Sequence, residues 1–393
     1  MSLAITNARV VPVEADPFTG TVVVEDGRIA ALGPDVAVPE GAEVVDAGGR
    51  WLLPGLIDAH VHLGVWEEGE GWAGQDTNEM TDPVMAAARA LDGINPREQG
   101  FDDALAGGIT AVNINPGSGN PIGGLTVAVK TYGRYVDEMV LRSPSGLKAA
   151  LGENPKRVYG DQKKTPSTRL GVALILRKAF TEARNYQQKA QRSEDPVESH
   201  LVNQALVQVL NREIPWRQHC HRADDIATAI RIAEEFGYQL VLDHGTESYL
   251  VADLVAEKGV PVLYGPLIVS RSKVEVRQRT PQAPGILDRA GVKVSIITDH
   301  PVVPIEHLIT QVALAVKEGM DRDAALRAVT INPAEVMGVA DRVGSLAVGK
   351  DADLVLWSGD PLELASRTLR VWIEGREVYT YDEEQRRGTV LPR

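Results

Sequence analysis

Two histidines stand two residues apart in the segment PGLIDAHVHLG, where an apolar run ends. In an extended strand, residues i and i+2 face the same side, so His60 and His62 can point together and share one divalent metal ion. Such a pair also arises by chance, and a histidine beside an apolar strand is often only hydrogen-bonded. The pair therefore indicates a metal site only if further ligands follow.

Further candidate ligands stand at the ends of other short apolar runs. The segment REIPWRQHCHR contributes His219 and His221, YQLVLDHG contributes His244, and VKVSIITDHP contributes Asp299 and His300. Six of the eight histidines in the chain thus lie at the ends of predicted strands, which random placement would seldom produce. Imidazole and carboxylate groups are the usual ligands of Zn²⁺ and similar ions, and a catalytic site keeps one position open for water.

A metal site of this composition predicts hydrolysis. A divalent ion brings the pKa of its bound water to about 7 and so supplies a nucleophile. Asp299 could touch the ion weakly, take the proton of this water and return it to the leaving group as a general acid. Asp299 could also cap the helix that follows, and the two roles are compatible. We expect one or two divalent ions per chain, with Zn²⁺ as the expected metal.

The elements that must carry these residues follow two kinds of pattern. Residues 1–54 and 345–393 read as short alternating strands around DG and GG turns, so we expect them to form together one small β-sandwich domain. Residues 55–344 alternate short β-branched runs with helical stretches, which predicts βα units and a parallel sheet. At this length an α/β fold of the (β/α)8 TIM barrel type is the simplest closure, and its active site lies at the carboxyl ends of the strands.

One stretch, residues 143–205, interrupts this alternation with many charges and a long helical segment. We interpret it as an elaborated βα connection, because long insertions usually form lids or binding loops. Its cluster of Lys156, Arg157, Tyr159 and Arg169 could bind a carboxylate or phosphate, although solvated surface charges are the default interpretation. The segment NPGSGNPIGG lacks the spacing of a nucleotide-binding loop and is expected to form a tight active-site turn.

The composition narrows the class of protein. A net charge of −13 disfavours nucleic acid as a partner. The single cysteine, Cys220, excludes an intrachain disulfide, and the first residues show no basic region followed by a long apolar run. No apolar stretch reaches the ~20 residues needed to span a bilayer. We therefore expect a cytoplasmic protein that acts on a small molecule without a membrane partner, and whose barrel surface could support a homo-oligomer.

Taken together, these motifs and the closing segment INPAEVMGVADRVGSLAVGKDADLVLW resemble the amidohydrolase superfamily over essentially the whole chain. The resemblance is strongest to its imidazolonepropionase-like and N-acetylglucosamine-6-phosphate deacetylase-like branches. It implies a TIM barrel with one or two divalent metals that hydrolyses a carbon–nitrogen bond, commonly in an amide, cyclic amide or amidine. Position by position, it implies as metal ligands His60, His62, His244 and Asp299.

The histidine that follows the fifth barrel strand is ambiguous, because HCHR places His219 and His221 on the same face of an extended segment. The spacing of the following helix resembles that of the family when His219 is the ligand, which leaves His221 to support a ligand or face the substrate. Cys220 points the opposite way and is expected to be a small core residue.

Binuclear members of the superfamily carry a bridging carboxylated lysine or glutamate after strand 3 or 4, and here the candidates are Glu153, Lys148 and Lys130. Glu153 is favoured, because its tight loop beside Gly152 can aim a carboxylate and because its distance before His219 resembles the deacetylase branch. A solvated charge is the alternative interpretation for each.

Candidate substrate contacts are Tyr264 in PVLYGPL, His300, Arg157 and Arg169. A tyrosine at a strand end is as often a packing residue.

The leading hypothesis is a hydrolase of a small amide, cyclic amide or acylated amino compound. A heterocycle deaminase on the same scaffold is an alternative, weakened because the glutamate that such enzymes carry after strand 5 cannot be placed. A non-catalytic metal-binding barrel protein is a third hypothesis, against which the retained His60, His62, His244 and Asp299 argue.

Overall fold

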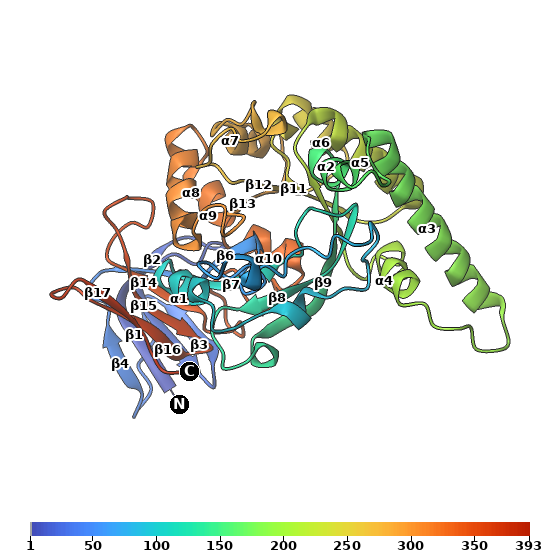
Figure 1. Ribbon diagram of the computed structural model, residues 1–393. Helices are drawn as coiled ribbons and strands as arrows, with labels where there is room; N and C mark the ends of the chain where they lie inside the picture. The colour runs from blue at the N-terminus through green and yellow to red at the C-terminus, as the bar shows by residue number, and fades with distance from the viewer. Residues whose placement is uncertain (1) are drawn as a thin grey trace.

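The computed structural model describes residues 2–393, and its strands form two sheets (Figure 1). The first sheet draws nine strands from both ends of the chain, in the order β17-β16-β15-β14-β5-β1-β2-β3, with β4 paired to β1. Its strands are β1 (Ser2–Val10), β2 (Phe18–Glu25), β3 (Arg28–Gly33), β4 (Glu43–Asp46), β5 (Trp51–Pro54), β14 (Leu354–Trp357), β15 (Thr368–Ile373), β16 (Arg376–Asp382) and β17 (Arg387–Val390). β5 and β14 join the two halves in antiparallel register, around a small apolar core of their own. The prediction that both ends of the chain share one sheet unit is confirmed.

The second sheet has eight strands in the order β13 to β6 and is nearly closed into a barrel. Its strands are β6 (Leu56–Val61), β7 (Ile109–Ile114), β8 (Ile122–Lys130), β9 (Val140–Ala150), β10 (Trp216–Cys220), β11 (Leu240–His244), β12 (Val262–Tyr264) and β13 (Val294–Ile296). Just beyond the first and last of these strands, the backbone N–H of His62 donates to the carbonyl oxygen of His300 at 2.9 Å. The carboxyl ends of β6 and β13 therefore meet, as a barrel requires.

β8 departs from the all-parallel pattern of a regular (β/α)8 barrel, because it runs antiparallel to both β7 and β9. The seven residues 115–121 that connect β7 to β8 are too few for a crossover, since parallel strands need a connection of a dozen or more residues. The glycine-rich segment is therefore a hairpin loop at the carboxyl end of β7.

The remaining barrel strands are connected through helices. The α-helices are α1 (Gln99–Ala106), α2 (Glu153–Asp161), α3 (Arg169–Arg192), α4 (Leu201–Leu210), α5 (Ala223–Phe236), α6 (Ala252–Glu257), α7 (Ala283–Arg289), α8 (Leu308–Lys317), α9 (Arg322–Arg327) and α10 (Ile331–Met337). Single 3-10 turns are η1 (Gly71–Gly74), η2 (Ala90–Gly93), η3 (Val136–Glu138), η4 (Ser248–Val251), η5 (Val274–Val276) and η6 (Ile305–His307). Within residues 2–393, no helix is both long enough and apolar enough to cross a membrane.

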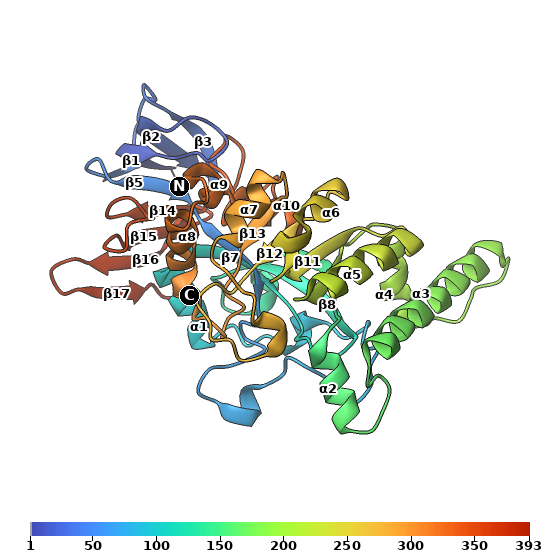
Figure 2. The ribbon, with the colours of Figure 1, turned by 90° about the horizontal axis from the view of Figure 1, so that it is seen from above.

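The insertion is helical, and its helices lie in two different places relative to the barrel. β9 continues to Ala150, so the insertion begins later than residue 143, and it consists of α2, α3 and α4. α3 packs through Phe180, whose ring stacks on Tyr238 with centroids 4.8 Å apart, and its far end then projects away from the barrel (Figures 1 and 2). α4 packs against α3 and returns to β9. α2, in contrast, lies beside the carboxyl end of the barrel, where it can contribute to a site.

Candidate active site

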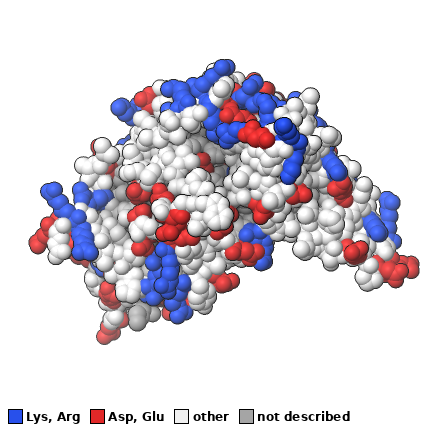
Figure 3. Space-filling view, in the orientation of Figure 1, with Lys and Arg blue, Asp and Glu red and all other residues white. Residues whose placement is uncertain are grey.

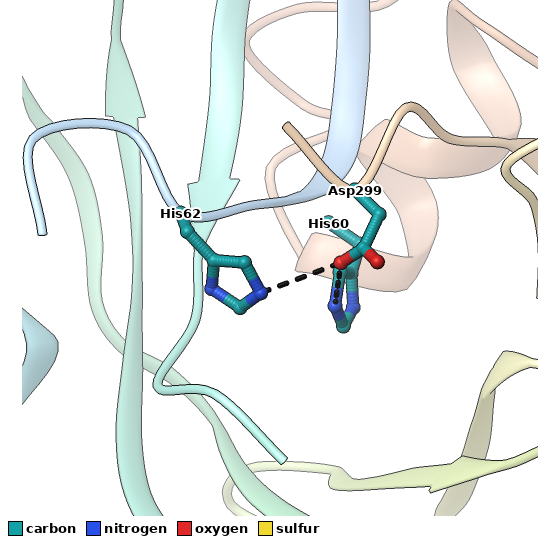
Figure 4. Close-up of side chains that lie close together, drawn as sticks. All are labelled: His60, His62 and Asp299. Atoms are coloured by element: carbon teal, nitrogen blue, oxygen red, sulfur yellow. Dashed lines mark ion pairs between the residues drawn. The ribbon is translucent and has the colours of Figure 1, made fainter. Parts of the chain in front are cut away.

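Three side chains converge at the carboxyl ends of β6 and β13 (Figure 4). Oδ1 of Asp299 lies 3.3 Å from Nε2 of His60 and 3.3 Å from Nε2 of His62. β6 ends at Val61, so His60 is within the strand and His62 follows it. The geometry thus brings together the three residues that the HxH and TDH segments proposed.

The protonation of His62 can be read from its other ring nitrogen. Nδ1 lies 2.8 Å from the carbonyl oxygen of Asn115, and a carbonyl oxygen only accepts hydrogen bonds. Nδ1 therefore carries a proton, and in a neutral ring Nε2 turns its lone pair toward the carboxylate of Asp299. The same reasoning applies to His244, whose Nδ1 lies 2.9 Å from the carbonyl oxygen of Gly265.

The backbone is strained where two of these residues leave their strands. His244 has φ 71° and Asp299 has φ 56°, in the left-handed region that residues other than glycine seldom adopt. Each residue stands at the carboxyl end of a barrel strand, where this conformation turns the side chain toward the barrel axis. Strain of this kind collects at functional sites.

His219 and His221 form a second group beside the first. They lie with Glu275, which is in η5, so that one ligand atom from each residue is within 4.8 Å of the others. Both ring nitrogens of His219 and Nε2 of His221 are buried without a hydrogen-bond partner in the described residues. Burial, reinforced by the neighbouring His244, holds the pKa of His219 and of His221 well below the usual range. The rings are therefore neutral, which is the form that binds metal ions.

The first group and the two histidines of the second line one pocket of about 400 Å³. Its polar floor consists of His60, His62, Lys148, His219, His221, His244 and Asp299. The β7–β8 loop lines one wall through residues 117–119, as expected for an active-site turn. Asn154 and Arg157 from α2 and Lys273 from the loop after β12 line it nearer the mouth. In Figure 3, Lys and Arg side chains gather along the upper edge of the face, although the chain as a whole is acidic.

A chain of buried charges lies beneath this floor. Nζ of Lys148, in β9, is 3.2 Å from Nε2 of His60 and 3.0 Å from Oδ2 of Asp243. Arg217 donates to Oδ1 of Asp243 at 2.9 and 3.0 Å. Burial alone would raise the pKa of Asp243, but Arg217 and Lys148 outweigh it and hold that pKa well below the usual range. Burial lowers the pKa of Lys148.

The three candidates for a bridging residue occupy different places. Only Lys148 reaches the histidines. Glu153 is the first residue of α2, where its N–H donates to Glu275 at 3.0 Å, and its side chain lines a separate outer depression. Lys130 lies at the far end of β8, where Nζ is paired with Asp351 at 2.8 Å and with Asp353 at 3.0 Å. The structure therefore does not bring Glu153 or Lys130 to the pocket, because a helix start turns one away and the antiparallel course of β8 carries off the other.

Of the candidate substrate contacts, some line the pocket and others do not. Arg157 lines the pocket, whereas Arg169 lies outside its lining and donates to Asp225 at 3.0 Å. The hydroxyl of Tyr264 is buried and donates to the backbone carbonyl of Thr280 at 3.1 Å, also outside that lining. His300 is buried behind Asp299.

The other residues of the insertion cluster do not line the pocket. Lys156 is exposed, and Tyr159 is buried with its hydroxyl donating to Asn120 at 2.7 Å. Cys220 is buried in the apolar core.

Glu275, Arg217 and Asp243 were not anticipated. Arg217 and Asp243 are charged residues within predicted strands, and Arg217 stands two residues before His219 on the same face. A charge that faces into the barrel could therefore have identified both residues as part of the site. Glu275 stands in the charged segment RSKVEVRQR and has no such signal. Only the tertiary fold buries it.

A barrel with histidines and an aspartate gathered at its strand ends around a pocket is an enzyme scaffold, and the order of these residues along the chain specifies the kind of enzyme. The Amidohydrolase family matches residues 51–380, so the chain belongs to the amidohydrolase family. It is a hydrolase acting on carbon–nitrogen bonds. The superfamily suggested by the sequence motifs is thereby confirmed.

Similar proteins support the same assignment. The amidohydrolase tasK of Hapsidospora irregularis is 31% identical over 391 residues, which cover 91% of this chain but only 40% of that protein. An imidazolonepropionase of Mesorhizobium japonicum is 24% identical over 88% of both chains. The crystal structure of an amidohydrolase from Thermotoga maritima MSB8 has a TM-score of 0.94 and 45% identity, and the match covers 96% of this chain and all of that one.

Proposed function

We propose that this chain hydrolyses the carbon–nitrogen bond of a small amide, cyclic amide or acylated amino compound, with one or two divalent metal ions, Zn²⁺ first among them, bound at the pocket floor. One observation carries the proposal: Nε2 of His60 and Nε2 of His62 both lie 3.3 Å from Oδ1 of Asp299, so two imidazoles and one carboxylate converge on a single point. Such a set of side chains is a usual ligand set for a divalent ion.

The donor set fits a divalent cation. Imidazole nitrogens and carboxylate oxygens suit Zn²⁺ and similar ions. Nδ1 of His62 and Nδ1 of His244 each donate to a backbone carbonyl oxygen, which fixes the rings as ligation requires. The unpartnered nitrogens of His219 are buried, which is costly for polar groups unless something binds them.

When bound, a divalent ion acidifies water and polarises a carbonyl oxygen. The protein supplies the proton transfers. Asp299 accepts the proton of the attacking water as the new carbon–oxygen bond forms, and it delivers this proton to the leaving nitrogen as the carbon–nitrogen bond breaks. Asp299 must begin as a carboxylate to take this proton, and a cation held between its Oδ1 and the Nε2 atoms of His60 and His62 would favour that form.

We assign the bridging position to Lys148, because it is the candidate whose amine touches a proposed ligand, His60 at 3.2 Å. Reaction of the amine with carbon dioxide would form an Nζ–carbon bond, release one proton and leave a carboxylate at this position. Glu153, which the sequence favoured, serves as the matched control.

We further propose that Arg157 and Lys273 hold an anionic group of the substrate. Both line the pocket on the side away from the barrel floor, and Lys273 is oriented by Asn154, with Nζ 3.2 Å from the amide oxygen. A carboxylate or phosphate would be bound there by charge-assisted hydrogen bonds.

Metal content by elemental mass spectrometry tests the proposal on wild type, Lys148→Met and Glu153→Ala. We expect Lys148→Met to bind at least one equivalent fewer than wild type, and Glu153→Ala to bind as much as wild type. An unchanged content in Lys148→Met removes the bridging assignment, and wild type without metal removes the metal-dependent hydrolysis itself.

A panel of N-acylated amino acids, cyclic amides, purines and pyrimidines then separates the substrate classes. Release of a carboxylic acid from an amide supports the proposal, whereas ammonia release from a heterocycle identifies a deaminase. Absence of turnover on the whole panel by protein that retains its metal favours a non-catalytic barrel protein. A cytoplasmic location and a homo-oligomeric state remain predictions.

A further inference from the structure

A third group of potential metal ligands lies outside the pocket. One ligand atom from each of Glu68, Glu98 and His300 is within 4.8 Å of the other two. Glu68 follows β6, Glu98 caps the N-terminus of α1, and His300 follows β13. None of the three lines the pocket around His60 and His62. The group therefore joins three separate segments behind the active-site wall.

Two of these residues are buried with ligand atoms that nothing in the described residues satisfies. Glu98 is 4% exposed and His300 is 0% exposed. Oε1 of Glu98 accepts the N–H of Gly100 at 2.9 Å, while its Oε2 has no partner. Both ring nitrogens of His300 also lack a partner. Buried polar atoms are normally hydrogen-bonded, so this cluster calls for a bound species.

The space between these atoms depends on a glycine. A Cβ at Gly100 would lie 2.5 Å from Cδ2 of Leu63, 2.8 Å from Oε2 of Glu98 and 2.8 Å from Nε2 of His300. Any other residue at position 100 would crowd the carboxylate and the imidazole as well as the leucine. The backbone therefore leaves room at the point toward which the carboxylate and the imidazole converge.

In the part of the chain that the structure describes, the cluster contains two carboxylates without a basic side chain paired to either. Nε2 of His300 lies 4.0 Å from Oε2 of Glu68, and no Lys or Arg within residues 2–393 forms an ion pair with either glutamate. Further acidic residues, Asp103 and Glu306, lie close enough to raise the pKa of Glu68, with burial as the larger cause. The carboxylate of Glu98 is buried, and a buried charge without a counter-charge is unfavourable.

We propose that Glu68, Glu98 and His300 bind a divalent cation at a site separate from the active-site metals. One imidazole and two carboxylates suit a borderline ion such as Zn²⁺ or Mn²⁺. The ion ties the loop after β6 and the start of α1 to the loop after β13. Because His300 follows Asp299 and accepts the N–H of His62 at 2.9 Å, this tie holds the active-site wall in place. The site does not depend on the proposed reaction.

The test is the number of Zn²⁺ equivalents bound after chelator-stripped full-length protein is dialysed against Zn²⁺. Wild type is compared with Glu98→Gln, which keeps an oxygen for the α1 cap, and with Glu68→Gln, an exposed position whose change should not affect folding. Asp103→Asn is the control, since it removes a nearby acidic group outside the three ligands. Both glutamine variants should bind one equivalent fewer than wild type and Asp103→Asn.

Equal content in wild type and both glutamine variants overturns the proposal and indicates that Glu98 and His300 share a proton instead. Lys148→Met in the same series separates this outcome from the active-site assignment. Metal lost in Lys148→Met but not in Glu98→Gln leaves the proposed function standing and removes only the additional site. Metal lost in Glu98→Gln but not in Lys148→Met supports the additional site and removes the bridging role of Lys148.

Discussion

Oδ2 of Asp243 lies 3.1 Å from Nδ1 of His60, on the side of the ring away from Asp299. A carboxylate in this position fixes the orientation of a ligating histidine and raises its basicity. The same carboxylate contacts Arg217 and Lys148, so it connects the proposed metal ligands to the buried polar groups beneath them.

We therefore expect Asp243→Asn to weaken Zn²⁺ binding by about 10–100-fold, measured by competition with a chromophoric chelator. The exposed Asp253→Asn on α6 should bind Zn²⁺ like wild type. Unaltered affinity in Asp243→Asn would show that His60 is oriented without it, or that His60 does not bind the metal.

Asp299→Asn tests the proton transfer. An amide in place of the carboxylate cannot accept the proton of the attacking water, so kcat should fall by about 10²–10⁴-fold on any substrate found in the panel. Most of the metal should stay, because the histidines of the floor remain. The exposed Asp341→Asn is the control. A variant of Asp299 with full activity would exclude it as the base.

The sequence was informative where chemistry depends on position along a strand. His60, His62, His244 and Asp299 could be placed because parallel strands bring their carboxyl ends to one face. The preference for Glu153 over Lys148 does not agree with the structure, because five residues of separation put Lys148 inside the barrel and Glu153 on an outer helix. Only the point where β9 ends decides between them. Glu275 was out of reach, since its burial arises from α2 and the β12–α7 loop packing together.

The antiparallel β8 is another feature that the sequence predicted only in part. The turn chemistry of residues 115–121 was read correctly, but its consequence for strand direction follows only when loop length is compared with the length of a crossover. That reversal places Lys130 against the small sheet instead of the pocket.

Lys130 is therefore expected to stabilise the junction between the two sheets. Its ammonium is the shared partner of Asp351 and Asp353, whose side chains are 2% and 3% exposed. Lys130→Met leaves buried carboxylates without this cation and should lower the free energy of unfolding by about 3–5 kcal/mol, measured by urea denaturation. Metal content should not change. Lys178→Met, at an exposed position on α3, is the control and should leave the free energy of unfolding unchanged. A loss of bound metal in Lys130→Met would instead indicate that Lys130 acts at the metal site.

Tyr264→Phe separates packing from substrate contact. The ring is buried and the hydroxyl donates to the carbonyl of Thr280. Removal of this hydrogen bond should lower the free energy of unfolding by about 0.5–1.5 kcal/mol and leave KM unchanged. A large rise of KM with unchanged stability would instead place the hydroxyl on the substrate.

Arg157 and Arg169 form a matched pair of basic residues from the same insertion, with opposite expected outcomes. Arg157 lines the pocket, whereas Arg169 is bound to Asp225. If Arg157 holds an anionic group of the substrate, Arg157→Gln removes a charge-assisted contact of about 1.5–3 kcal/mol and should raise KM about 10–100-fold with little effect on kcat. Arg169→Gln should leave KM unchanged and reduce the stability, because Asp225 is buried and loses its counter-charge. Steady-state kinetics on an anionic substrate and on its neutral ester or amide give the answer: the defect of Arg157→Gln must disappear with the neutral compound, and an equal defect on both would mean that Arg157 shapes the mouth without binding the charge.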